Sequence, residues 1–128
     1  MSNILVVDDE YFCRCFVEDM LISAGYDVFV ACNGNDALLV LKNNSVDVVV
    51  TDVFMPEKDG IELIIEVKKI QSVHGVIAIS GGGRLFKGFQ FLNLVKPLGA
   101  DICLEKPIDR NELIEAVARI MRKHRFNF

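Results

Sequence analysis

The chain has 128 residues, of which 52% are hydrophobic and 25% charged, and its formal net charge at pH 7 is −4. This length and balance fit one folded domain and exclude a disordered chain. The net negative charge excludes a general attraction to nucleic acid, and no apolar run is long enough to span a membrane. The first residues lack the basic start of a signal peptide, so we expect a cytoplasmic domain.

Taken in chain order, five short apolar runs rich in Val and Ile predict β-strands. The runs are Ile4–Val7, Val28–Ala31, Val46–Thr51, Val76–Ile79 and Ile102–Leu104. Their apolar residues are continuous rather than alternating, which indicates strands covered on both faces. The pattern is typical of a parallel sheet.

Helical patterns lie between the strands, and the first is the clearest. Its apolar residues follow the i, i+3, i+4, i+7 spacing of one buried stripe. They are Cys13, Phe16, Val17, Met20, Leu21 and Ala24, and Gly25 ends the helix. Two shorter patterns predict helices around Ala37, Leu38 and Leu41 and around Ile61, Ile64, Ile65 and Lys68, the latter preceded by Gly60.

The last helix is predicted around Leu113, Val117, Ile120 and Met121 and begins with a capping box of Asp109 and Glu112. A basic cluster follows, made of Arg119, Arg122, Lys123, His124 and Arg125. Cations complement the dipole at the end of a helix. We favour this explanation, and we do not expect direct nucleic-acid binding.

Four cysteines are expected to be buried core residues. Cys13 and Cys15 fall in the first helix, and Cys32 and Cys103 fall in predicted strands. Their spacing matches no zinc site, and a free cysteine in a reducing compartment behaves as a small hydrophobic residue.

Alternating strands and helices predict a doubly wound (βα)5 domain with a central parallel sheet. Ligands of such folds bind at the carboxyl ends of the strands. Asp8 and Asp9 follow the first strand, Asp52 the third, Ser80 the fourth and Lys106 the fifth. Each residue alone could cap a helix, open a turn or lie on the surface, but their shared edge indicates a site.

These groups suit phosphoryl transfer. Three neighbouring carboxylates repel one another, so a cation is implied, and hard oxygen ligands suit Mg²⁺ and also admit Mn²⁺. With the metal and the Lys106 ammonium on either side, Asp52 becomes a nucleophile for an electrophilic phosphorus. The Ser80 hydroxyl could bind a phosphoryl oxygen.

The motifs resemble those of the receiver domains of two-component response regulators. They are the segment Ile4–Glu10 with its acidic pair, the segment Asp52–Gly60, Ser80, the run Gly99–Asp101 and the pair Lys106–Pro107. The resemblance implies one receiver domain over residues 1–128, with a flavodoxin-like fold and strand order 2-1-3-4-5. It also implies that the Lys106–Pro107 bond is cis.

The resemblance assigns roles to the site. Asp52 would be the phosphoacceptor, and Ser80 and Lys106 would hold the phosphoryl group. The implied Mg²⁺ ligands are Asp52, Asp9 directly, Asp8 largely through water, and Phe54 through its backbone carbonyl.

The resemblance also implies partners. A histidine kinase or phosphotransfer protein would supply the phosphoryl group, and phosphorylation would alter binding to a downstream protein. No turnover of a substrate is expected beyond the domain's own phosphorylation and slow autodephosphorylation. A single-domain phosphorelay shuttle and a docking module that ignores phosphorylation are the alternatives, and the chain is either a stand-alone receiver or part of a longer regulator.

Three features of the sequence modify these expectations: one cysteine, one run of glycines and one phenylalanine. Cys103 stands where the family usually has a Tyr or Phe that follows the Ser/Thr hydroxyl, and a thiol cannot copy that motion. We therefore expect the loop at Gly81, Gly82 and Gly83 to report phosphorylation. The bulky Phe54 is expected to hinder water and prolong the phosphorylated state.

The apolar Leu85, Phe86, Phe89 and Phe91 after the glycines could complete the core or form a partner surface.

Other functions fit the sequence less well. The glycine run lacks the pattern of a nucleotide-binding loop. An FMN carrier would need a phosphate loop where acidic residues stand, and a haloacid-dehalogenase-type phosphatase would need a second Asp where Phe54 stands.

Overall fold

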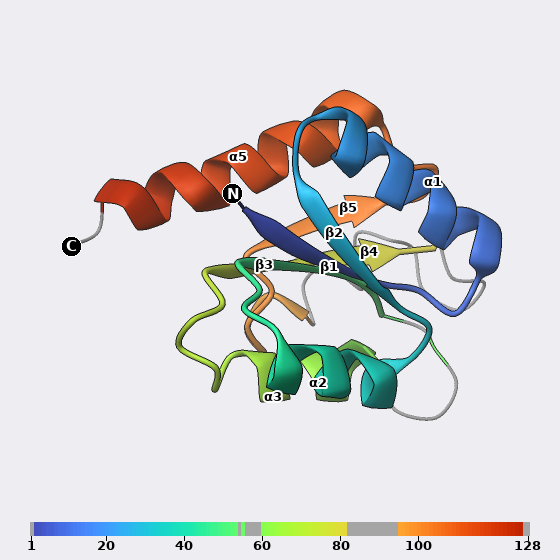
Figure 1. Cartoon of the computed structure of the whole chain (residues 1–128). Coiled ribbons are helices and arrows are strands. Elements are labelled where there is room, and N and C mark those ends of the chain that lie inside the picture. Colours follow the sequence, from blue (N-terminus) through green and yellow to red (C-terminus); the bar gives the residue numbers. More distant parts are fainter. Residues whose placement is uncertain (1, 54, 56–59, 82–94, 127–128) are drawn as a thin grey trace.

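The structure is a computed structural model that describes residues 2–53, 55, 60–81 and 95–126 (Figure 1). Phe54, Gly82, Gly83 and the four apolar residues of the glycine-rich segment lie outside the described residues. The expectations placed on them therefore stay predictions.

Five strands and four helices are present in the described part of the chain. They are β1 (Asn3–Val7), α1 (Tyr11–Ser23), β2 (Asp27–Ala31), α2 (Gly34–Asn43), β3 (Val48–Asp52), α3 (Gly60–Val67), β4 (Gly75–Ser80), β5 (Ile102–Glu105) and α5 (Arg110–Phe126). The five predicted strands are confirmed, with ends that differ by one or two residues. Val46 precedes β3 instead of opening it, and Asp52 and Ser80 are the last residues of their strands.

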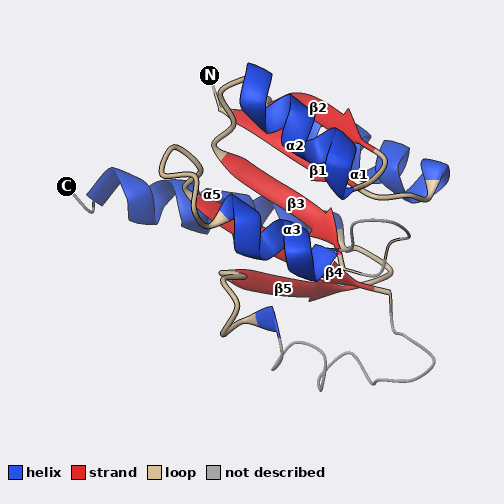
Figure 2. Ribbon diagram, turned by 90° about the horizontal axis from the view of Figure 1, so that it is seen from below, coloured by secondary structure: helices blue, strands red, loops and turns tan. Residues whose placement is uncertain are grey.

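The strands form one parallel sheet in the order β2-β1-β3-β4-β5, as a flavodoxin-like fold requires. Helices α1 and α5 cover one face, and α2 and α3 cover the other (Figures 1 and 2). The order reverses between β1 and β3, so the crevice at their carboxyl ends lies at the topological switch point.

Alternation along β1 shows why both faces are apolar. Ile4 and Val6 pack with α1 and α5, and Leu5 and Val7 pack with α2 and α3. Successive side chains of a strand point to opposite faces, so a strand in the middle of this sheet needs a continuous apolar run.

The predicted buried stripe of α1 is correct at Val17, Met20 and Leu21 but wrong at Phe16, whose residue surface is 59% exposed. Phe16 lies about 100° around the helix from Val17, at the margin of the stripe. A broad apolar pattern therefore overestimated the width of the buried face.

The prediction that every cysteine is a core residue is wrong for Cys32, which is exposed just beyond β2. Its Sγ–H donates to the Asp36 carboxylate at 2.8 Å, in the turn that opens α2. The other three cysteines are half-buried, and all four are free. The strand ends at Ala31, so Cys32 lies in the turn that follows and not in the sheet.

Local details of the last helix agree with the sequence. The Asp109 carboxylate accepts the Glu112 backbone N–H at 2.9 Å, which confirms one half of the capping box. The Lys106–Pro107 peptide bond is cis, as the resemblance implies. None of the described helices has both the length and the apolar composition that crossing a membrane needs.

Gly60 fixes the position of α3 against the end of β3. Its N–H donates to the Val53 carbonyl at 3.0 Å, and a Cβ at this position would overlap the Asp52 carbonyl oxygen and the Val53 Cα. Backbone atoms cannot move aside as a flexible side chain can. Glycine is therefore required for close packing here.

We expect Gly60→Ala to lower the free energy of unfolding by about 1–3 kcal/mol, the usual cost of overpacking. Urea denaturation would measure it. Gly81→Ala is the control, because a Cβ there meets only the Lys106 Cδ at 3.9 Å, an ordinary contact. Equal stability of the two variants would contradict the steric argument.

Candidate functional site

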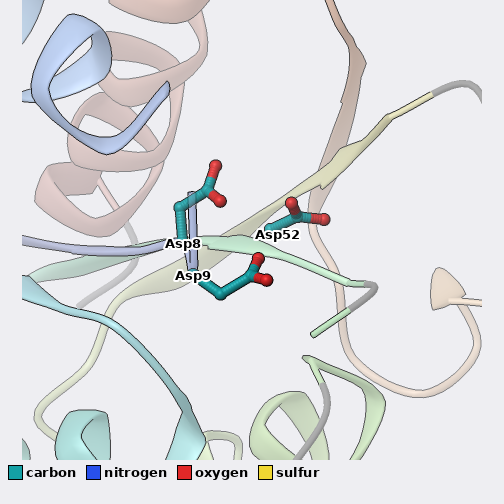
Figure 3. A group of neighbouring side chains, drawn as sticks. All are labelled: Asp8, Asp9 and Asp52. Carbon is teal, nitrogen blue, oxygen red and sulfur yellow. The ribbon is translucent and has the colours of Figure 1, made fainter. Parts of the chain in front are cut away.

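Three acidic side chains converge at the carboxyl ends of β1 and β3 (Figure 3). Asp8 and Asp52 are buried, Asp9 is exposed, and each offers a carboxylate oxygen within 4.8 Å of the others. Such close carboxylates repel one another unless a positive charge lies among them. Their oxygen donors form a candidate site for a hard divalent cation.

Main-chain pairing positions two of these carboxylates. The Asp8 N–H donates to the Ala31 carbonyl at 3.1 Å, and its Oδ1 accepts the Glu10 N–H at 2.9 Å. Asp52 pairs in register with Ile79 of β4. Both side chains are therefore carried by the rigid end of the sheet instead of a free loop.

Lys106 supplies positive charge to the cluster. Its Nζ lies 2.9 Å from the Asp52 Oδ2 and 3.1 Å from the Asp8 Oδ2. Burial alone would lower the pKa of Lys106, but its hydrogen bond to Asp52 and the charges of Asp52 and Asp8 outweigh burial and raise that pKa well above its ordinary value. The ammonium is charged throughout the physiological range.

Ser80 is the last residue of β4 and is 1% exposed. Its carbonyl accepts the Lys106 backbone N–H at 2.8 Å, so the two residues are tied together through the main chain. Its Oγ makes no hydrogen bond within the described part of the chain. Leaving a buried hydroxyl without a hydrogen-bond partner costs free energy of folding. Such a hydroxyl is therefore a candidate donor to an oxygen of a bound ligand.

Most of the predicted site residues therefore lie together. Asp8, Asp9, Asp52 and Lys106 are in one cluster, and Ser80 is bonded to the backbone of Lys106. Gly81 follows Ser80 as an exposed residue. Phe54, Gly82 and Gly83 are not placed.

Two supporting residues were missed by sequence reasoning. The Arg14 guanidinium donates to the Asp8 carbonyl at 3.0 Å, and the buried Thr51 hydroxyl donates to the Asp52 carbonyl at 2.8 Å. Both bonds hold the main chain of an acidic residue. Neither belongs to a motif, because a single bond to a backbone carbonyl leaves no sequence pattern.

Cys103 lies in β5, in register with Ala78, and packs half-buried against the core beneath α2 and α3. Burial raises the pKa of its thiol, so the reactive thiolate is disfavoured at neutral pH. The position is therefore a packing position in the described structure.

Comparison with known proteins gives consistent matches. A family model described as the response regulator receiver domain matches residues 4–118. A Haemophilus influenzae protein named as a homolog of the transcriptional regulatory protein CpxR is 37% identical over 123 residues, which cover 96% of this chain and 52% of that protein. The Klebsiella pneumoniae transcriptional regulatory protein CpxR is 33% identical, with 96% and 50% covered.

Among solved structures, a response regulator receiver domain protein from Clostridium thermocellum superposes with a TM-score of 0.88 at 30% identity, over the full length of both chains. The chain spans about half the length of the curated relatives that it matches. The similarity to the solved structure covers the whole fold, including both faces of the sheet.

Proposed function

Because this chain belongs to the response regulator receiver family, we propose that Asp52 accepts a phosphoryl group from the phosphohistidine of a histidine kinase or phosphotransfer protein. The observation that carries the proposal is the position of the Asp52 carboxylate, which lies buried within reach of the Lys106 ammonium and beside two further carboxylates. Phosphoryl transfer depends mainly on positioning and charge neutralisation, and this arrangement supports both.

The acidic cluster fits a divalent cation. Three carboxylate oxygens within 4.8 Å are hard donors, and Lys106 contacts only two of the three residues, Asp8 and Asp52. We propose that Asp8, Asp9 and Asp52, with the backbone carbonyl of Phe54, hold Mg²⁺, and that Mn²⁺ can replace it. When bound, the ion would neutralise negative charge on the phosphoryl oxygens.

The protein's own groups have separate tasks. One Asp52 oxygen forms a bond to phosphorus as the bond from phosphorus to the donor's imidazole nitrogen breaks, which leaves an acyl phosphate. Lys106 has three N–H donors, of which Asp8 and Asp52 occupy two, so one remains for a phosphoryl oxygen. The buried Ser80 hydroxyl can bind another.

The expected consequence is signalling rather than substrate turnover. Ser80 and Lys106 are joined by a backbone hydrogen bond, so a phosphoryl group bound by both would act on β4 and on the segment after β5 together. We propose that phosphorylation displaces these two segments and thereby alters binding to a downstream protein. The matched relatives are named as transcriptional regulators, so we propose that this downstream step acts in transcription.

Intact mass spectrometry tests the proposal. The purified chain would be incubated with a small acyl phosphate donor, once with Mg²⁺ and once with EDTA. We expect a mass gain of one phosphoryl group that depends on Mg²⁺. Absence of any gain across donors and divalent cations would refute the proposed function.

Mg²⁺ is also expected to stabilise the fold, because it binds the folded cluster and not the unfolded chain. At a concentration 100-fold above its Kd, the free energy of unfolding should rise by about 2.7 kcal/mol. Thermal denaturation with and without Mg²⁺ would measure the effect. Asp9→Asn should reduce the response strongly, and the control Asp19→Asn, at an exposed position of α1, should leave it unchanged. An equal response in the two variants would place the ion elsewhere.

A further inference from the structure

A basic cavity lies at the amino-terminal ends of the strands, whereas Asp52 lies at their carboxyl ends. Its volume is about 520 Å³, and its polar lining consists of His74, Asp101, Arg119, Arg122, Lys123 and His124. His74 directly precedes β4, and Ser80 ends that strand. At about 3.3 Å per residue, the two ends of the strand lie roughly 20 Å apart. The cavity is therefore separate from the acidic site.

Two histidines line one side of this cavity, His74 from the loop before β4 and His124 from α5. The rings of His74 and His124 stack with centroids 3.4 Å apart and an interplanar angle of 17°. The His74 Nε2 lies 3.3 Å from the Asp47 Oδ1, and its backbone N–H donates to the Asp47 carbonyl at 2.7 Å. These contacts hold the end of α5 against the loop before β4, so the cavity does not depend on α5 alone.

The lining is strongly positive in a chain that is acidic overall. Arg119, Arg122 and Lys123 are spaced i, i+3 and i+4, so they share one face of α5 and repel one another. The acidic lining residue, Asp101, already accepts the Val76 N–H at 2.8 Å and the Lys68 ammonium at 3.3 Å. Three permanent positive charges thus line the cavity with one carboxylate that is already engaged, and a second carboxylate, Glu115, pairs with Arg122 from outside the lining.

The helix dipole does not explain this arrangement. Its effect is confined to about the last turn of a helix. That accounts for Lys123, but Arg119 lies about two turns before the end of α5 at Phe126. His74 lies outside the helix altogether. Convergence of these side chains on one cavity therefore calls for another cause.

We propose that the cavity binds a small polyanion with adjacent phosphate groups. Arginine guanidinium groups bind phosphate oxygens in pairs, and neighbouring cations on one helix face match neighbouring anionic groups. The volume is in the range of small-molecule sites. One guanidinium nitrogen of Arg122 binds Glu115 at 2.8 Å, which leaves its other N–H donors for a ligand.

Titration calorimetry with inorganic tripolyphosphate tests the proposal. The full chain would carry Asp52→Asn and the titration would contain no Mg²⁺, so neither phosphorylation nor metal chelation can contribute. We expect saturable binding of one ligand per chain, with weaker binding of monophosphate. No saturable binding, or equal binding of both, would overturn the proposal.

Matched variants locate the site. Arg119→Gln and Lys123→Gln should each weaken binding about tenfold, as expected for loss of a charged hydrogen bond. Lys42→Gln removes the same charge from the last turn of α2, outside the cavity, and should change nothing. An equal loss in all three variants would show general electrostatic attraction and refute the cavity as the site.

Glu115→Gln supplies a test of opposite sign, because it releases Arg122 from its ion pair and should strengthen binding. Thermal denaturation of each variant would verify folding.

A short DNA duplex tests the competing possibility that this surface binds nucleic acid. If it binds more tightly than tripolyphosphate and responds to the same variants, the surface serves nucleic acid and the small-ligand proposal is wrong.

Discussion

Asp52→Asn is expected to abolish uptake of a phosphoryl group from a small acyl phosphate donor. Asparagine keeps the size of the side chain, but its amide is not a nucleophile for phosphorus. Asp52 is buried and lies 2.9 Å from the Lys106 ammonium, whereas Asp9 is exposed. Asp8 is also buried beside Lys106, but its second carboxylate oxygen already accepts the Glu10 N–H. Intact mass spectrometry after a fixed incubation would measure the loss.

Asp19→Asn, which changes an exposed carboxylate on α1, is the matched control and should take up the group like the unmodified chain. The adduct should be lost in neutral hydroxylamine, which cleaves an acyl phosphate and leaves a serine phosphate intact. A mass gain that persists in Asp52→Asn and survives hydroxylamine would instead indicate Ser80 or another hydroxyl as the acceptor.

Lys106→Met should lower the free energy of unfolding of the metal-free chain by about 3 kcal/mol. The substitution removes the ammonium that contacts Asp8 and Asp52 and leaves both buried carboxylates without it. Urea denaturation would measure the change, and Mg²⁺ should narrow the difference because it restores positive charge. Lys68→Met breaks a more exposed pair with Asp101 and should cost less than about 1 kcal/mol.

The ion pairs of Lys106 with Asp8 and Asp52 should also make the stability of the chain depend on pH. The pKa of Lys106 is raised in the folded state, so its stabilisation is fully present below the ordinary lysine pKa of about 10.4. It is lost as the pH rises above that value toward the folded-state pKa. The unmodified chain should therefore lose stability in this range, and Lys106→Met should lack this contribution. Parallel pH profiles would contradict the assigned ion pair.

The sheet and the acidic edge could be predicted because their signals are local. Apolar runs such as Val48–Val50 identify strands, and parallel strands bring their carboxyl ends to one edge, so Asp52 and Lys106 meet although they are 54 residues apart. Exposure of Phe16 and Cys32 could not be predicted in this way, because it depends on where the covering layer ends.

Single side-chain contacts that belong to no motif also could not be predicted from the sequence. The Arg14 bond to the Asp8 carbonyl has no motif, and the stacking of His74 on His124 joins residues far apart in the chain. The cations of α5 were visible in the sequence, but the cavity was not. Only the packing of α5 beside β4 brings His74 to them.

The length of β4 has an electrostatic consequence for a chain with a net charge of −4. One end of the strand adjoins the acidic cluster, and the other adjoins the basic cavity, roughly 20 Å away. At physiological ionic strength, the Debye length is about 8 Å. Counterions therefore screen the exposed charges at the two ends of the strand from one another. The molecule behaves as a dipolar particle whose exposed charges at either end can be altered independently.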